Sequence, residues 1–593
     1  MFRVERWPIT VLSVMLFLAV FIMPAELWLV KTLVDRIQAW ITPDPIDSIL
    51  AAAAWLAALL IMNNIGFVPV PLAMTRLNEI GTLEEQRLVM HKTSRLPLTL
   101  VEAPRIKELR ERALQVSLYA IYDTGSHFMQ GSLQSAVLII VMLAYGQWLP
   151  VVAICAAALL QTYVMSKSAA SLERLNRKQT PSSRLLRHYA GLMTKREAAK
   201  EIRLFCFGQL LAARWSALYR SQSKEKWDIA RSSELRKIGP ELLMVLIGGL
   251  LVSLLVLQPG ANKLTAGEFT LLFMVLTMLL SQLQGLIHRA VSMRTQYMRW
   301  ADFRTYMNLE DDPRAGRQET SKVVKDDTSV VMDRISEGNA DGSRSIAAPG
   351  GMKLEVRKLH YRYPGAVCDT LKDISLSIPS GCRAAVVGEN GSGKSTLVKL
   401  LTGMYMPGCG EIIWSREGER IPAADSAEGH LSAVFQDFTR LYVTLRENVA
   451  LGNLAAMDQD SELQNSLRAA GSRLSDLEMQ IGSPFDGIEP SGGQWQQIAT
   501  ARALLRNASF VFFDEPTAAL DPLAEKKAFD LFLRVTEGRS ALLVTHRLGA
   551  AKLADVIFVL KDGRLVEQGT HNELIAQQGE YSRMFQLQAS WYG

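Results

Sequence analysis

Three glycines, a lysine and three hydroxyl residues are gathered in G-E-N-G-S-G-K-S-T, the segment from Gly388 to Thr396. A short apolar stretch typical of a buried strand, Arg383–Val387, precedes it, and the helix-like L-V-K-L-L-T follows. A glycine-rich turn between a strand and a helix lets backbone N–H groups close around phosphates at the positive end of the helix. We therefore predict a P-loop, and its expected contact residues are Gly388, Asn390, Gly391, Ser392, Gly393, Lys394, Ser395 and Thr396.

The side chains of this loop indicate a nucleoside triphosphate bound together with a metal ion. Lys394 is placed to reach the β- and γ-phosphates. The hydroxyl of Ser395 is an oxygen ligand of the kind that Mg²⁺ prefers. The loop therefore predicts phosphate binding with Mg²⁺ as a cofactor.

Two further expected strands end in residues suited to hydrolysis. Ser509–Phe513 runs into Asp514 and Glu515, and Ala541–Val544 is followed closely by His546. A carboxylate at a strand end beside a P-loop suits a Mg²⁺ ligand, here Asp514, and the next one suits a general base that polarises water. His546 is expected near the γ-phosphate. The alternative for the two acids is an ordinary acidic strand end.

Bulk composition excludes some classes of protein. The 593 residues are too many for a single core, so we expect at least two domains. A formal net charge of only +6 argues against a nucleic-acid partner. The five cysteines lack metal-ligand spacing, which indicates free thiols facing a reducing compartment.

The first half of the chain carries apolar runs of the length that crosses a bilayer, about 20 residues. We expect six crossings, near Ile9–Val30, Ile49–Met74, Ser132–Gln147, Leu149–Met165, Pro240–Gln258 and Leu264–Ile287. The lipid bilayer is therefore an expected partner of this half.

Two long polar connections, about 75–131 and 166–238, are rich in lysine and arginine. The positive-inside rule places them, the N-terminus and the C-terminal half in the cytoplasm. Their helical periodicity predicts that the membrane helices continue into the cytosol. Glu26, Glu241 and Glu268 lie in or near apolar runs, where acids are functional candidates, but all three are close enough to run ends to reach water.

Several motifs of the second half occur in a fixed order after a polar segment, 310–351, that has the composition of a solvated linker. Besides the P-loop, they are V-F-Q-D-F (Val434–Phe438), P-S-G-G-Q (Pro490–Gln494), F-V-F-F-D-E-P-T (Phe510–Thr517), A-A-L-D (Ala518–Asp521) and T-H-R (Thr545–Arg547). With these motifs the chain resembles the ATP-binding cassette (ABC) transporter family, specifically an exporter half-transporter.

The resemblance implies an α-helical six-helix transmembrane domain of the type IV ABC exporter fold over residues 1–309. A linker over 310–351 and an α/β P-loop NTPase nucleotide-binding domain over 352–593 complete the implied architecture. It also implies an ATP hydrolase with ATP and Mg²⁺ as cofactors, spanning the cell membrane several times with its ATP domain in the cytoplasm.

The resemblance assigns roles that spacing alone does not give. Tyr363 resembles the aromatic residue that stacks on adenine, with a buried strand tyrosine as the alternative. Gln436 resembles the glutamine that contacts Mg²⁺ and water, so the implied metal-contacting residues are Ser395, Gln436 and Asp514, and the implied catalytic residues are Glu515, His546 and Gln436. Asp521 resembles the acid that communicates across a dimer.

In this family the S-G-G-Q segment of one subunit completes the ATP site of the other, which implies contacts from Ser491, Gly492, Gly493 and Gln494. A dimer is therefore implied, with a second copy of the chain as the simplest partner and a related half-transporter as the alternative. Pro490 replaces the commoner leucine. Because it precedes the helix, it removes no helical hydrogen bond, and we expect the segment to work.

The resemblance implies export by alternating access, in which ATP-driven closure of two nucleotide domains draws together loop tips near Leu100–Lys107 and Leu204–Gln209. Trp495, which follows the S-G-G-Q segment (Ser491–Gln494, the signature segment), and the segment Arg187–Phe205 are similar to bacterial exporters of lantibiotic-type peptides, which points to a peptide cargo. A lipid or multidrug exporter or flippase stays open, as does an ATP-gated channel or sensor of the same architecture. Nucleic acid is not an expected partner.

Overall fold

The computed structural model describes residues 7–39, 46–257, 265–312, 350–421, 430–482, 486–515 and 522–590. The chain divides into two compact units. The helical unit comprises Met1–Ser94 and Arg105–Leu309, and the sheet unit comprises Arg95–Pro104 and Glu310–Gly593. Asp521 and residues 313–349, which form most of the expected linker, lie outside the described residues.

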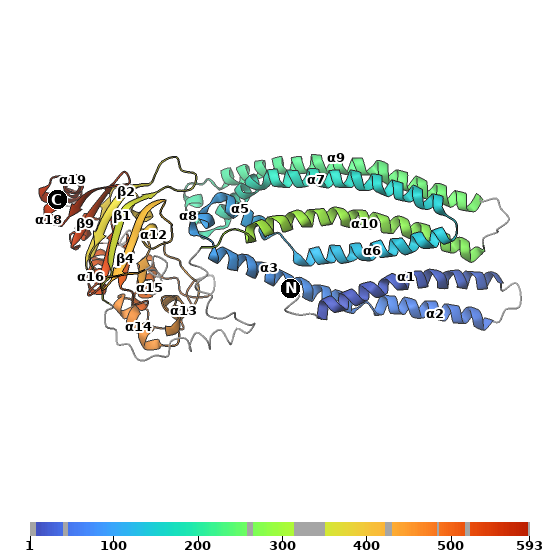
Figure 1. The fold of residues 1–593 in the computed structure, drawn as a ribbon, viewed down its shortest axis with the longest axis horizontal. Coiled ribbons are helices and arrows are strands. Elements are labelled where there is room, and N and C mark those ends of the chain that lie inside the picture. The colour runs from blue at the N-terminus through green and yellow to red at the C-terminus, as the bar shows by residue number, and fades with distance from the viewer. Residues whose placement is uncertain are drawn as a thin grey trace. The chain divides into compact units, whose positions relative to one another are not determined.

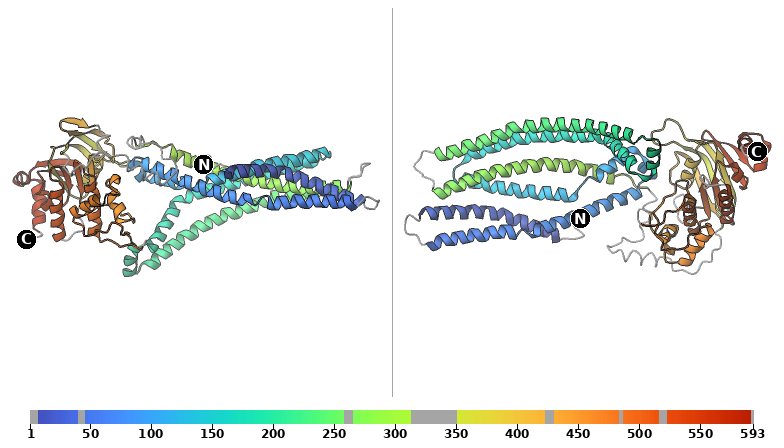
Figure 2. Two further views of the ribbon diagram at one scale, coloured as in Figure 1. Left: turned by 90° about the horizontal axis from the view of Figure 1, so that it is seen from below. Right: turned by 180° about the vertical axis from the view of Figure 1, so that it is seen from behind.

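Long helices that run side by side, together with the short helices α5 and α8, make up the helical unit (Figures 1 and 2). They are α1 (Trp7–Ala39), α2 (Ile46–Ile65), α3 (Pro69–Arg95), α5 (Pro104–Ala113), α6 (Leu118–Ala144), α7 (Trp148–Thr194), α8 (Arg196–Leu204), α9 (Gly208–Leu257) and α10 (Ala266–Met307). Helix α7 has 47 residues and is therefore about 70 Å long, more than twice the roughly 30 Å of a hydrocarbon core. The expected continuation of membrane helices into the polar connections is confirmed.

Four helical stretches among the described residues are long and apolar enough to cross a membrane: Trp7–Gln38, Leu118–Ala144, Trp148–Asn176 and Ala266–Met307. A shorter apolar helix covers Asp47–Asn63. The expected run that starts at Pro240 lies in the C-terminal part of α9. The total of six crossings stays a prediction.

The second expected crossing, Ile49–Met74, is not one continuous helix. Helix α2 ends at Ile65, residues 66–68 form a turn, and α3 begins at Pro69. Proline has no backbone N–H with which to continue a helix, but its fixed φ suits the first helical position. Because the whole stretch is apolar, hydropathy alone did not reveal the turn between α2 and α3.

The core of the helical unit lies between α6, α7 and α10. Leu138 and Met142 of α6 pack with Val275 and Leu279 of α10 and with Ile154 of α7, and all of these side chains are buried. Close van der Waals contacts of this kind hold helices together in lipid, where there is no hydrophobic driving force between them.

A polar cluster joins α1 to the start of α10. Lys31 Nζ donates to Tyr145 Oη over 2.9 Å and to Glu268 Oε1 over 3.4 Å, and Gly267 N donates to Asp35 Oδ1 over 2.9 Å. Glu268 also completes the N-terminal capping box of α10. This acid, one of the three near apolar runs, therefore has a structural role in holding helix ends together.

Two sheets and several short helices make up the sheet unit. One sheet is antiparallel, with the order β2-β1-β4-β5, and the other has the order β10-β9-β3-β8-β7-β6. The strands are β1 (Lys353–Tyr361), β2 (Leu371–Ile378), β3 (Arg383–Gly388), β4 (Cys409–Arg416), β5 (Glu419–Ile421), β6 (Leu431–Val434), β7 (Phe510–Asp514), β8 (Ser540–Val544), β9 (Val556–Lys561) and β10 (Arg564–Gly569). The helices are α4 (Leu98–Glu102), α12 (Lys394–Leu401), α13 (Leu445–Ala450), η2 (Leu454–Ala456), α14 (Asp460–Ala469), α15 (Gly492–Leu505), α16 (Pro522–Val535), α17 (Leu548–Ala551), α18 (His571–Ala576) and α19 (Glu580–Ala589).

The three strands expected from the sequence are neighbours in the larger sheet. β8 lies between β3 and β7, and both pairings are parallel. Since parallel strands end at one edge of a sheet, the residues that follow β3, β7 and β8 are brought close together. This topology builds the site.

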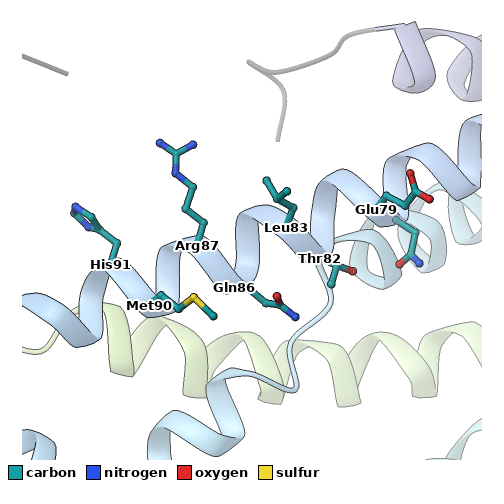
Figure 3. A pocket seen from close by; sticks show the side chains of 8 residues that line it. Glu79, Thr82, Leu83, Gln86, Arg87, Met90 and His91 are labelled. Atoms are coloured by element: carbon teal, nitrogen blue, oxygen red, sulfur yellow. The ribbon is translucent and has the colours of Figure 1, made fainter. Parts of the chain in front are cut away.

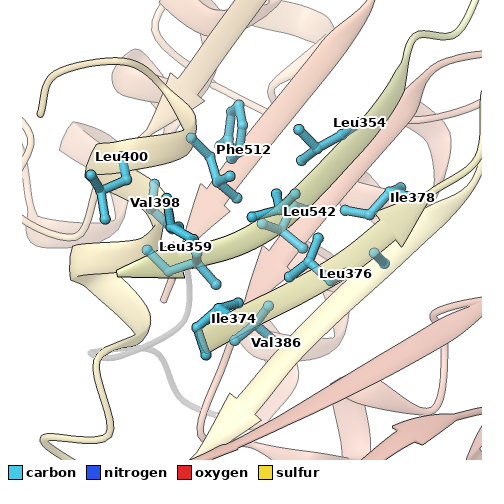
Figure 4. Packing of buried hydrophobic residues seen from close by; sticks show 14 of the residues in the cluster. Leu354, Leu359, Ile374, Leu376, Ile378, Val386, Val398, Leu400, Phe512 and Leu542 are labelled. Atoms are coloured by element: carbon cyan, nitrogen blue, oxygen red, sulfur yellow. The ribbon is translucent and has the colours of Figure 1, made fainter. Parts of the chain in front are cut away.

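The main core of the sheet unit lies between its two sheets and α12. Leu354 and Leu376 of the antiparallel sheet pack with Val386, Phe512 and Leu542 of the larger one, and all five are buried (Figure 4). A parallel sheet covered on both faces explains why its strands are continuous apolar runs rather than alternating ones.

Candidate functional site

The P-loop leaves β3 at Gly388 and enters α12 at Lys394. Gly393, the residue before the helix, has a φ of 101°, a left-handed conformation that favours glycine. A side chain at Gly388 would collide with the carbonyl oxygen of Leu560 on β9. The loop therefore keeps its path from β3 into α12 only with glycine at these positions.

The side chain of Lys394 is held within the loop that it belongs to. Its Nζ donates to the carbonyl oxygens of Gly388 and Glu389, each over 2.9 Å, and the residue is buried. Burial lowers the pKa of Lys394, while the charges of Glu515 and Asp514 oppose this shift. The ammonium group is thus fixed beside two carboxylates, at the position where phosphate charge would be neutralised.

Asp514, at the end of β7, has the properties of a cation ligand. Burial, together with the charge of Glu515, raises the pKa of its carboxyl to about 6, and a hydrogen bond with Ser395 opposes the rise. Its Oδ1 is buried and has no hydrogen-bond partner within the described part of the chain. A buried oxygen without a partner is costly. A hard cation bound by this oxygen and the Ser395 hydroxyl would remove that cost, so these residues fit Mg²⁺.

The three expected catalytic side chains meet at the strand ends. Gln436 Nε2 donates to Glu515 Oε2 over 3.1 Å, and His546 Nδ1 lies 3.4 Å from Glu515 Oε1. Glu515 has a φ of 48°, which is rare for a residue with a side chain, and its N–H donates to Val544 O over 2.9 Å. This geometry places one carboxylate between an amide and an imidazole, as expected of a base that orients water.

The signature segment forms the start of α15. Ser491 is the N-cap, since its Oγ accepts from Gln494 N and its N–H donates to Gln494 Oε1. Ser491 and Gly492 are exposed, and apart from the neighbouring residues and the backbone of α15 itself, no heavy atom among the described residues lies within 4 Å of the point where Gly492 would carry a Cβ. Pro490 is buried before the helix, so it packs as expected. The side chain of Gln494, an expected nucleotide contact, is used by the cap.

Tyr363 lies just beyond β1 and is half-buried. Its Oη is 3.0 Å from Thr396 Oγ1, and its ring packs edge-on against Tyr361 and Tyr405. The structure thus brings Tyr363 to the P-loop helix. The sequence did not mark Tyr405, which follows α12 in an ordinary loop, and only strand alternation in β1 marks Tyr361 as buried.

The remaining expected residues that the structure describes occupy their expected elements. Asn390 and Gly391 are exposed on the P-loop, and Ser392 is buried there. Gly493 is the second residue of α15. Asp521 lies outside the described residues.

An open hollow elsewhere in the chain is lined by eight side chains of α3, which are Asn78, Glu79, Thr82, Leu83, Gln86, Arg87, Met90 and His91 (Figure 3). None of the site residues expected from the sequence lies on this helix. The hollow is a face of a single helix, and we assign it no chemistry.

Comparison with known proteins gives three kinds of match. The family model described as ABC transporter matches residues 371–518. The chain is 27% identical to the subtilin transport ATP-binding protein SpaT of Bacillus subtilis over 84% of its own length and 78% of that protein's. It is 28% identical to the nisin transport ATP-binding protein NisT of Lactococcus lactis subsp. lactis over 84% and 80% of the two chains.

Two further matches concern another cargo and the fold. An ATP-dependent lipid A-core flippase of Bordetella avium (strain 197N) is 31% identical over 57% of this chain and 54% of the flippase. The structure of a bacterial Atm1-family ABC exporter with ATP bound covers 99% of both chains with a TM-score of 0.76 and 20% identity. A likeness of this extent shows a shared fold over the whole chain. The helical unit is accordingly a membrane domain, and the sheet unit contains the cytoplasmic ATP domain. Residues 371–518 thus form an ATP-binding domain of the ABC transporter type, and the whole chain has the fold of an ABC exporter, an architecture in which ATP hydrolysis is coupled to transport.

Proposed function

We propose that two copies of this chain form a homodimeric exporter in which each copy completes the ATP site of the other. A single chain carries both a P-loop and a signature segment. The N-terminus of α15 supports the composite site, because Ser491 and Gly492 are exposed and the space beside Gly492 is open among the described residues. Exposed N–H groups at a helix start attract a phosphate, and the γ-phosphate of an ATP held by the partner copy fits this position.

Within each site, the residues of this chain divide the work. The P-loop amides and Lys394 hold the phosphates, and Ser395 and Asp514 would hold Mg²⁺, which neutralises phosphate charge when bound. Glu515 accepts a proton from the attacking water, and Gln436 and His546 fix its carboxylate through the contacts described above. Tyr363 contacts the adenine, and Asp521 communicates between the copies.

A mixed dimer tests the composite site. Lys394→Ala and Ser491→Arg should each inactivate a homodimer. In a dimer that contains one copy of each variant, one site combines an intact P-loop with an intact signature. Coexpression of the two variants should therefore restore activity at about a quarter of the wild-type sites, because about half of the dimers are mixed. Failure to restore ATP hydrolysis in purified mixed dimers would contradict the homodimer with shared sites.

For the cargo we propose an amphiphilic peptide. The supporting observation is that two relatives named for subtilin and nisin transport match 84% of this chain, a stretch too long to lie in the ATP domain alone. A lipid is the second candidate, because the lipid A-core flippase reaches a higher identity, 31%, over a shorter stretch.

Reconstituted liposomes distinguish the two cargoes. We expect ATP-dependent accumulation of a fluorescent cationic amphiphilic peptide, and no such accumulation with Glu515→Gln. Translocation of a fluorescent lipid without peptide accumulation would support the second candidate and contradict the first.

A further inference from the structure

A cavity of about 580 Å³ lies within the sheet unit, where the C-terminal ends of α14, α15 and α16 meet (Figure 1). Its walls include Ala469, Leu505 and Val535, the last residues of these three helices. Helix α15 has 14 residues, so its C-terminal end is about 20 Å from the signature segment at its start. The cavity is therefore separate from the surface at which α15 is proposed to contact nucleotide.

Arg539 is a buried cation of this cavity whose partners are all neutral. Its Nη2 donates to Asn507 Oδ1 over 2.8 Å, and its Nη1 lies 3.4 Å from Ala508 O. The residue is only 8% exposed, and burial lowers the pKa of its guanidinium group. Among the residues that the structure describes, it pairs with no carboxylate. Since buried charges are normally paired, and a guanidinium has more N–H donors than these two contacts use, Arg539 can still bind a carboxylate that enters the cavity.

Charged side chains of both signs line the cavity without pairing with one another. Arg534 and Arg539 carry positive charge, and Glu462 and Glu537 carry negative charge. Arg534 Nε lies 3.3 Å from the backbone oxygen of Asp530, and within the described part of the chain neither arginine forms an ion pair with either glutamate. A simple anion would be repelled by the two carboxylates. A molecule with one anionic and one cationic end would instead be attracted at both ends.

Amide side chains make up much of the remaining polar lining. They belong to Asn453, Asn465 and Asn507. The Oδ1 atoms of Asn465 and Asn507 accept from Arg468 and Arg539, so the Nδ2 groups are left to donate to carbonyl oxygens of a ligand. The C-terminal ends of the three helices carry partial negative charge, which favours an ammonium group. A peptide backbone with free termini presents all of these partners.

We propose that this cavity binds a short peptide with free termini, whose carboxylate contacts Arg534 and Arg539 and whose ammonium group faces Glu462 and Glu537. The volume lies within the range of roughly 300–1,000 Å³ that is usual for small-ligand sites, which suits a peptide of about two to four residues. The site is independent of the proposed cargo, because it lies in the sheet unit and not among the membrane helices.

Peptides with blocked termini test the site in the full-length protein in lipid nanodiscs. Mg²⁺ and a non-hydrolysable ATP analogue are present at saturation, so that the nucleotide sites are filled. Trialanine should slow hydrogen exchange in residues 504–507 and 534–539, and its concentration dependence gives the Kd. Acetylation of its N-terminus and amidation of its C-terminus should each raise this Kd at least about tenfold, because each removes a charged hydrogen-bond partner.

Variants of the charged lining assign each end of the peptide. Arg534→Gln should raise the Kd of trialanine and reduce the cost of amidation, whereas Arg420→Gln, a change of an exposed arginine outside the cavity, is the matched control. Glu462→Gln combined with Glu537→Gln should reduce the cost of acetylation, and Glu411→Gln is its control. All four proteins should hydrolyse ATP at the wild-type rate without peptide, which shows that they fold.

The blocked peptides decide the proposal on the wild type alone, whether or not a variant folds. Equal affinity of the free and blocked forms, or no slowing of exchange in residues 504–507 and 534–539, would overturn it. Slowing by inorganic phosphate but not by trialanine would show a site for a simple anion and would also overturn it. Failure of the ATP analogue to slow exchange in residues 388–396 would instead contradict the proposed nucleotide site.

Discussion

The two units of this molecule place polar and apolar side chains in opposite ways. In the helical unit, Trp55 and Leu159 are 69% and 73% exposed, as suits a surface that faces lipid. In the sheet unit, comparably large side chains such as Trp414 and Phe512 are buried. In the helical unit, an exposed apolar side chain therefore indicates contact with lipid. In the sheet unit, which water surrounds, a large exposed apolar surface would instead indicate a binding partner.

Buried polar groups differ between the units as well. In the sheet unit, Lys394 and Asp514 are buried because the site requires them. In the helical unit, Gln134 donates to Ala19 O over 3.1 Å and accepts from Gln282 over 3.1 Å, so it joins three helices. A buried polar residue marks chemistry in the first case and packing in the second.

The largest expected effect comes from the base in the sheet unit. Glu515→Gln should lower ATP turnover by about 10²- to 10⁴-fold, because the amide cannot accept a proton from water. The variant should still bind ATP and hold the dimer closed. Phosphate release and fluorescent nucleotide binding measure the two properties, and turnover at the wild-type rate would contradict the role of Glu515.

The signature segment should give the next largest effect. Ser491→Arg fills the open space at the start of α15, where the phosphate held by the partner copy is proposed to bind. The rate of ATP turnover should therefore fall at least about tenfold. Ser491→Asp is the informative companion, since aspartate also caps a helix but repels phosphate. If Ser491→Asp kept the activity of the wild type, Ser491 would act only as a helix cap and would not contact phosphate.

A matched pair of leucines sharpens the comparison of the two surfaces. Leu542→Ala empties part of the buried core of the sheet unit and should lower the free energy of unfolding by about 2–5 kcal/mol. Leu159→Ala removes a side chain from an exposed position of α7 and should change it by less than about 0.5 kcal/mol. Thermal melts in nanodiscs compare them, and equal effects would break the contrast between the units.

The smallest expected effect concerns the protonation of Asp514. Its carboxyl holds a proton in the folded state up to about pH 6, whereas in the unfolded chain it releases it near about pH 4. This contribution to stability is therefore complete below about pH 4 and is lost as the pH rises through about 6.

Without nucleotide or Mg²⁺, Asp514→Asn should accordingly be more stable than wild type at pH 7.5, by about 1–3 kcal/mol, and this difference should be clearly smaller at pH 4.5. Melting curves at the two pH values measure the difference. Mg²⁺ with ATP should stabilise the wild type but not the variant. A variant less stable than wild type at pH 7.5 would show that the buried charge has a partner without the metal.

The sequence was sufficient to predict the strands that carry the site, because a P-loop requires a strand before it and a helix after it. It did not reveal contacts that depend on distant packing. Glu268 is 237 residues from Lys31, and Glu102 is 303 residues from Tyr405. Gln494 was expected to contact nucleotide from its motif alone, but local geometry gives its side chain to the helix cap.

The membrane domain was predicted less completely for a related reason. Hydropathy averages over a window, so it does not register the turn after Ile65, where a glycine and a proline interrupt an apolar stretch. Nor do apolar helix faces specify a cargo, because a lipid tail and a hydrophobic peptide side chain present similar surfaces.

The length of α7 and α9 has a mechanical consequence. Gln222 bonds Ser182 over 2.7 Å and lies within 3.3 Å of Gln179, which fastens the two helices to each other at an intermediate point. The pair then behaves as one stiff lever about 70 Å long, and a tilt of about 10° displaces its far end by about 12 Å. A small rotation at one end of the pair would therefore become a large displacement at the other end.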